Sequence, residues 1–188
     1  SSFGAIGSAT MLGNGKVLIA GGITEESGNA GFATDECFIY DPATGAVQPT
    51  GSMSRRRTGH AATLLQSGEV LIAGGTNTLS DPIQALAQTT NTAEKWDPAT
   101  GLWTAAPSMP EALILPSMTT LRSGFVLVAG GYNANYVIGL PQAFGSVATC
   151  SFYNPFANTW SSAPSMNDDR CMHTFNTVLL SDGSVLVS

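Results

Sequence analysis

The stretch Glu-Val-Leu-Ile-Ala-Gly-Gly at residues 69–75 is a short apolar run that ends in two glycines. It returns with few changes at residues 16–22 and again at residues 125–131, so the steps between copies are 53 and 56 residues. Self-similarity at a period of about this size is the signature of an architecture built from tandem supersecondary units. The stretch therefore predicts that one module occurs three times.

Two further markers fix the extent of each module. An aromatic residue followed by Asp-Pro or Asn-Pro recurs in every copy, and Met53, Met109 and Met166 close the copies at steps of 56 and 57 residues. The fourth copy ends before its paired glycines, so it supplies only the first half of a module. The resulting modules are residues 1–53, 54–109 and 110–166, followed by the partial module 167–188.

Each module has the pattern of four short strands. In the second module, runs at residues 60–65 and 70–73 flank a tight Ser-Gly turn and form a hairpin. A third run ends at Trp96 and, after an Asp-Pro turn, a fourth carries Trp103. None of these runs has the apolar period of a helix. A sheet of this size cannot bury both faces alone, so we expect an all-β chain whose sheets stack on one another.

These markers resemble the kelch repeat. The resemblance rests on the paired glycines, the aromatic residue before Asp-Pro or Asn-Pro, and a Trp seven residues after that aromatic residue. It implies a kelch-type β-propeller segment of three four-stranded blades plus the first half of a fourth. The first module departs from the pattern, because Val47 stands where the later Trp would be. The repeat positions are Gly21, Gly22, Gly74, Gly75, Gly130, Gly131, Tyr40, Trp96, Trp103, Tyr153 and Trp160.

The number of blades is too small for a closed ring. Propellers close with roughly 4 to 8 blades. An open stack would leave its outermost sheet faces in water and its edges unpaired. We therefore expect the remaining blades to come from a longer chain, or from other copies of this one.

Composition narrows the classes of partner. The 188 residues carry a net charge of -6, and only 11% of them are charged. Nucleic acid is an unsuitable partner for such a surface. We expect no membrane span, because no apolar run reaches the roughly 18 residues that a spanning helix needs. Sparse charge, few lysines and abundant Ser, Thr and Gly suit an extracellular protein.

The cysteines are predicted to be structural. Cys37 and Cys150 occupy the same position in the first and third modules, so a whole blade separates them and they cannot form a disulfide. Cys171 lies elsewhere, at the start of a first strand. These spacings form no zinc signature, and we predict no metal site and no cofactor.

Two histidines stand in similar contexts, each three residues after an arginine. His60 follows Arg57, and His173 follows Arg170. Some kelch-type propellers resemble galactose-oxidase-like copper radical oxidases, in which histidines and tyrosines at this place hold copper. Met172 stands where that family would place a ligand Tyr, and no Tyr occurs in a first strand. We favour a hydrogen-bonded role for these histidines and keep the secreted copper oxidase as an alternative.

The loops carry the best-supported candidate site. The turns within each hairpin are short and lie together at one end of the blades, whereas the connections at residues 23–33, 76–88 and 132–147 lie at the other end and are long and apolar. We call this second end the long-loop face. Its apolar residues either pack on one another or form a contact surface. The candidate binding residues are Phe32, Arg57, His60, Leu79, Ile83, Tyr132, Tyr136, Phe144, Arg170 and His173.

The sequence favours binding over catalysis. It contains no Gly-x-Ser-x-Gly elbow, no phosphate loop and no His-Glu-x-x-His motif, and we name no catalytic residue. The predicted function is a non-catalytic scaffold that presents the long-loop face to a protein or a carbohydrate. The alternatives are the copper radical oxidase and a structural or self-assembling propeller protomer.

Overall fold

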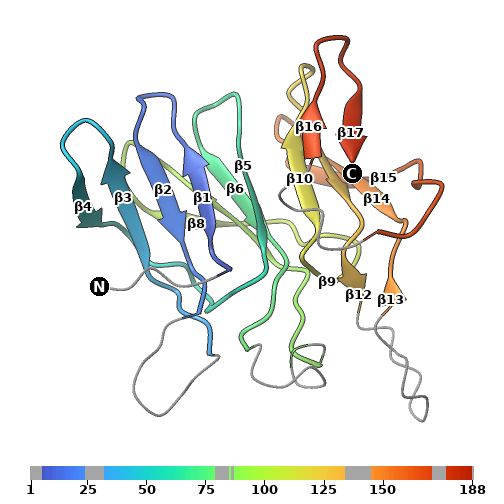
Figure 1. The fold of residues 1–188 in the computed structure, drawn as a ribbon, viewed down its shortest axis with the longest axis horizontal. Helices are drawn as coiled ribbons and strands as arrows, with labels where there is room; N and C mark the ends of the chain where they lie inside the picture. The colour runs from blue at the N-terminus through green and yellow to red at the C-terminus, as the bar shows by residue number, and fades with distance from the viewer. Residues whose placement is uncertain are drawn as a thin grey trace.

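The computed structural model describes residues 6–23, 32–78, 85, 87–133, 145–170 and 177–187. Figure 1 shows antiparallel sheets that follow one another along the chain, with the short hairpin turns together at one end of the blades. Three sheets have four strands each. The all-β prediction is confirmed. Within the described residues, no helix has the length and apolar character needed to cross a membrane.

The first sheet is a meander of four strands in chain order. Its strands are β1 (Ser8–Met11), β2 (Val17–Ala20), β3 (Cys37–Asp41) and β4 (Ala46–Pro49). The β1–β2 turn closes through Gly15, whose φ of 81° favours glycine. We call this sheet blade 1.

The second sheet, blade 2, repeats this topology. Its strands are β5 (Ala61–Leu64), β6 (Val70–Ala73), β7 (Ala93–Trp96) and β8 (Trp103–Ala106). Strand β6 has the limits expected from the sequence. All four of its residues are buried, because other sheets cover both of its faces.

The third sheet, blade 3, and a two-stranded hairpin complete the series. Blade 3 has the order β10-β11-β14-β15, and the hairpin pairs β16 with β17. The strands are β10 (Ser117–Thr120), β11 (Val126–Ala129), β14 (Cys150–Asn154), β15 (Thr159–Ala163), β16 (Thr177–Leu179) and β17 (Val185–Val187).

A small additional sheet at the long-loop end did not follow from the sequence. It joins β9 (Leu113–Ile114), β12 (Tyr132–Asn133) and β13 (Gly145–Ser146), with β12 in the middle. Strand β9 belongs to the link between blades 2 and 3, whereas β12 and β13 belong to a long connection of blade 3. Two-residue strands have no periodicity, so only the tertiary structure reveals the pairing.

The first strands of successive blades lie side by side. Strand β5 contacts both β1 and β10, and β10 also contacts β16. We call these four the inner strands (Figure 1). The apolar cores lie between blades: one cluster fills the space between blades 1 and 2, and another the space between blades 2 and 3. The first cluster includes Leu18, Met53, Ile72 and Trp96; the second includes Leu71, Met109, Val126 and Tyr153.

The paired glycines bring the end of each second strand against the next link. The N–H groups of Gly22, Gly75 and Gly131 donate to the carbonyls of Arg57, Leu113 and Arg170, at 3.0, 2.8 and 2.9 Å. Gly75 has a φ of 90°, and a Cβ there would lie 2.6 Å from the Thr58 carbonyl oxygen. Only glycine permits both this torsion and this contact.

The later Trp of a blade is bonded to the blade before it. The indole Nε1 of Trp103 donates to the Gly51 carbonyl at 2.8 Å, and that of Trp160 donates to the Pro107 carbonyl at 2.7 Å. Val47 pairs with Tyr40 in the register in which Trp103 pairs with Trp96. Val47 is 41% exposed, on a face of blade 1 that no described blade covers.

Two of the cysteines are described, and both follow the prediction. Cys37 and Cys150 are buried and free. Burial raises the pKa of the Cys37 thiol to about 12, so it behaves as a small apolar side chain. Cys171 lies outside the described residues.

Candidate functional site

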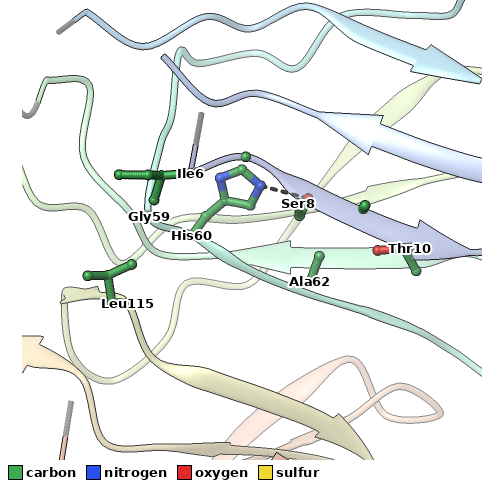
Figure 2. A pocket seen from close by; sticks show the side chains of 9 residues that line it. Ile6, Ser8, Thr10, Gly59, His60, Ala62 and Leu115 are labelled. Atoms are coloured by element: carbon green, nitrogen blue, oxygen red, sulfur yellow. Dashed lines mark hydrogen bonds between the residues drawn. The ribbon is translucent and has the colours of Figure 1, made fainter. Parts of the chain in front are cut away.

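A cavity of about 300 Å³ lies where inner strands β1 and β5 meet the link that leads to β10. We call it the inner-strand pocket. It is at the long-loop end of the inner strands, because several of its residues directly precede or begin those strands (Figure 2). Its lining residues are Ile6, Gly7, Ser8, Ala9, Thr10, Gly59, His60, Ala62 and Leu115.

Three residues at the rim occupy equivalent places in successive blades. Ile6, Gly59 and Leu115 each stand two residues before an inner strand, and their φ angles are 60°, 62° and 54°. The Gly59 N–H donates to the Ile6 carbonyl at 3.0 Å, and the Leu115 N–H donates to the Gly59 carbonyl at 2.7 Å. This left-handed conformation costs an L residue roughly 1–2 kcal/mol. The pocket is thus bordered by two apolar residues in strained conformations.

His60 and Ser8 join blades 1 and 2 inside the pocket. Figure 2 shows the His60 ring directed toward Ser8, and its Nε2 lies 2.9 Å from Ser8 Oγ. The His60 side chain is only 4% exposed. Burial, with a smaller contribution from the positive charge of Arg57, lowers the pKa of His60 to about 3. The imidazole is therefore neutral at physiological pH.

The Ser8–His60 pair lacks the properties of an activated nucleophile. A general base works best when its pKa is near the working pH, and a third group usually orients it. The pKa of His60 is far below that range, and its Nδ1 has no hydrogen-bond partner among the described residues. The geometry is that of a polar contact in the wall of a binding pocket.

Arg57, three residues before His60, is fully buried. Its Nη1 donates to the carbonyls of Gly74 and Thr92, at 2.9 and 3.1 Å, and its Nη2 lies 2.6 Å from Glu94 Oε1. Glu94 Oε2 accepts the Ser54 N–H at 2.8 Å. Arg57 therefore cannot contact a partner directly, unlike the surface residue that the sequence suggested. The run of three arginines at residues 55–57 predicts a solvated loop with one arginine tied to neighbouring carbonyls, and the fold shows that this arginine is Arg57.

Comparison with known proteins finds similarity to kelch proteins. The Kelch motif family model matches residues 56–110, which contain strands β5 to β8. The Kelch-like protein terF of Aspergillus terreus (strain NIH 2624 / FGSC A1156) is 28% identical over 162 residues, which is 86% of this chain and 34% of terF. The chain is thus similar to kelch proteins over its second blade by the family model and over most of its length by this relative. It spans about a third of the length of this curated relative.

A solved structure shares the fold of this chain. The structure of YjhT superposes with a TM-score of 0.66 at 15% identity, over 87% of this chain and 53% of that one. An identity this low supports a shared fold only. The kelch interpretation of the paired glycines and the aromatic markers thus agrees with the family model and with the sequence relative.

The other predicted site residues that the structure describes are spread over the long-loop end of the blades. Phe32 is 43% exposed and forms a bridge with Thr78 of the next blade. Tyr132 is half-buried beside Ile114, and Arg170 is exposed while its backbone bonds to Val147 and Gly131. Neither Phe32, Tyr132 nor Arg170 lines the inner-strand pocket. Leu79, Ile83, Tyr136, Phe144 and His173 lie outside the described residues.

Sequence reasoning missed most of the pocket. Of the candidates that the structure describes, only His60 lines it; Ile6, Ser8 and Leu115 were not singled out. Aligning the modules on their paired glycines would have placed Ile6, Gly59 and Leu115 at one repeat position. Nothing in the sequence gave the contact between Ser8 and His60. In the part of the chain that is described, no three His, Cys, Asp or Glu side chains gather as metal ligands would.

Proposed function

We propose that this kelch-repeat chain is a non-catalytic scaffold that presents its long-loop face to a partner protein. Kelch repeats generally mediate protein binding. The observation that carries the proposal is the inner-strand pocket, which brings apolar side chains and several polar groups together at that end of the blades. Such a pocket is the usual form of a specific recognition site.

The surroundings of the pocket support a preformed surface. The bridge between Phe32 and Thr78 and the Ala33 N–H bond to the Asn77 carbonyl, at 2.9 Å, tie the long connections of blades 1 and 2 together. The sheet of β9, β12 and β13 does the same between the link to blade 3 and its long connection. A surface that is rigid before binding loses little conformational entropy on association.

We further propose that more blades complete the propeller. One face of blade 1 carries two cross-strand rows, Met11-Val17-Tyr40-Val47 and Ala9-Ile19-Phe38-Pro49. Met11 on this face is 60% exposed. A sheet face of this composition matches the faces that blade 2 buries on both sides. Blades from the rest of a longer chain would cover it.

Site-specific photo-crosslinking tests the partner proposal. A benzophenone amino acid is placed at Phe32 or Ile6 on the long-loop face and, as matched controls, at Asn14 or Ser67 in the exposed short turns. Each variant is irradiated in an extract of the source organism. The proposal predicts that one protein crosslinks to both long-loop positions and to neither control. Crosslinking from the short turns alone, or no protein crosslinked from the long-loop positions, would contradict it.

A further inference from the structure

We propose that the inner-strand pocket binds an uncharged aliphatic side chain of a protein partner together with a main-chain carbonyl beside it. This inference rests on the proposed function and specifies its chemistry. Three properties of the pocket carry it: the absence of charge from its described lining, a hydroxyl that is left to donate, and the placement of bulky residues in a strained conformation.

The described lining contains no ionised side chain. It has no Lys, Arg, Asp or Glu, and His60 is neutral because it is buried. A charged group placed here would lose its hydration without gaining a partner. Ile6, Ala9, Ala62 and Leu115 supply apolar surface. The cavity of about 300 Å³ is at the small end for ligand sites, which suits one anchoring side chain.

The polar side of the pocket offers a donor. Nδ1 of His60 is buried without a partner, and a buried N–H without an acceptor is rarer than an undersatisfied acceptor. The positive charge of Arg57 also disfavours a second proton on the imidazole, so one ring nitrogen keeps its lone pair. The ring proton is therefore assigned to Nε2, which donates to Ser8 Oγ. The Ser8 hydroxyl proton is then left to bond an acceptor in the pocket, and a peptide carbonyl is the acceptor that a protein partner carries at every residue.

The backbone conformation of the rim residues supports the inference independently. Gly59 adopts the left-handed conformation without penalty, whereas Ile6 and Leu115 hold the same conformation against their preference. Ile6 is 42% exposed, so burial within this chain does not compensate for its strain. Backbone strain of this kind concentrates at binding sites. The bulk of Ile6 and Leu115 is thus placed where an incoming aliphatic group would contact it.

Titration followed by amide NMR tests the inference. The probes are the N-acetyl, N-methylamide derivatives of leucine, lysine and glutamate, together with methyl β-glucoside. The leucine derivative should shift the amide signals of Gly7, Gly59 and Ala62 saturably, and bind about tenfold more tightly than either charged derivative. Equal binding of the charged derivatives, tighter binding of the glucoside, or shifts confined to other residues would overturn the inference.

Variants of the lining sharpen the test. Ala62 is half-buried, lines the pocket and lies on the face of blade 2 that packs against blade 1, so Ala62→Phe should fill the pocket and abolish binding of the leucine derivative; Ala43→Phe, in an exposed short turn, should not. Ser8→Ala should weaken binding about tenfold through the lost donor. Leu115→Gly should weaken binding without lowering the melting temperature. Retained affinity in Ala62→Phe would overturn the inference. A partner that crosslinks at the long-loop face while the leucine derivative fails to bind would uphold the proposed function and overturn this inference alone.

Discussion

Strands β2 and β6 have the same sequence, Val-Leu-Ile-Ala, but not the same burial. Every residue of β6 is fully buried, whereas in β2 Leu18 and Ala20 are buried and Val17 and Ile19 are only half-buried. Both strands pair in register with a first and a third strand. The difference is the neighbour: blade 2 stands between two blades, and blade 1 has a described blade on one face only. The environment of a repeat residue is set by the next repeat.

This comparison gives the energetic rule of the chain. In a stacked-repeat protein each unit contacts only its neighbours, so stability is close to a sum over the interfaces between units. Substitutions at an interface between blades should therefore lower the free energy of unfolding strongly. Equivalent substitutions on the uncovered face of blade 1 should lower it only slightly.

The largest expected effect is that of Gly75→Val, at the covered end of β6. The added Cβ would lie 2.6 Å from the Thr58 carbonyl oxygen and 3.0 Å from the backbone nitrogen of His60. We expect a loss of about 4 kcal/mol or more in the free energy of unfolding. Gly68 has the same φ of 90° with nothing within 4 Å of its added Cβ, so Gly68→Val is the matched control and should cost much less. Urea denaturation measures both. A melting temperature for Gly75→Val equal to that of His60→Ala would count against the account.

A similar loss is expected from breaking the buried ion pair of blade 2. Leu113 and Ser151 occupy in blade 3 the positions that Arg57 and Glu94 occupy in blade 2. Arg57→Leu leaves the Glu94 carboxylate buried without its partner and should cost about 3 kcal/mol. The double variant Arg57→Leu, Glu94→Ser recreates the blade 3 combination and should recover most of that loss. Denaturation curves that show no recovery would mean that the guanidinium stabilises mainly through its bonds to Gly74 and Thr92.

The sequence predicted the blades better than the pocket, for a physical reason. Strand limits such as Val70–Ala73 follow from local patterns that each module repeats. The pocket depends on contacts between modules: Ser8 and His60 are 52 residues apart, and neither residue type signals the other. The ion pair of Arg57 was equally hidden, because its partner Glu94 stands on an otherwise ordinary strand. Periodicity describes the repeated part of a module, whereas binding groups are the positions at which modules differ.

His60 makes the interface between blades 1 and 2 sensitive to acid. Its pKa is 6.5 in the unfolded chain and about 3 in the fold, so the unfolded state binds the proton first as pH falls. The stability that neutral His60 contributes is complete above about pH 6.5 and is lost as pH falls toward about 3. We expect about 2 kcal/mol of this loss between pH 6.5 and pH 4.5. His60→Gln should flatten the pH dependence in that window; unchanged slopes would contradict the assignment.

The smallest expected effect concerns the tryptophan bonded across the same interface. Trp103→Phe leaves the Gly51 carbonyl without its donor and should cost about 1–2 kcal/mol. The converse change, Val47→Trp, restores the missing aromatic residue on the uncovered face of blade 1. Because no described blade lies against Val47, it should change stability by no more than about 0.5 kcal/mol. Thermal denaturation would show the contrast, and a large effect at Val47 would refute it.

The most direct test of the central claim uses the two isoleucines of the shared Val-Leu-Ile-Ala sequence. Ile72 faces blade 1, so Ile72→Ala leaves a cavity between the blades and should lower the free energy of unfolding by about 3 kcal/mol. Ile19 lies on the uncovered face, so Ile19→Ala should lower it by about 1 kcal/mol. Both variants of this chain are unfolded in urea at low, varied protein concentration. The account predicts this gap at every concentration. Equal losses at the two positions would contradict the claim that neighbouring blades determine what each repeat buries.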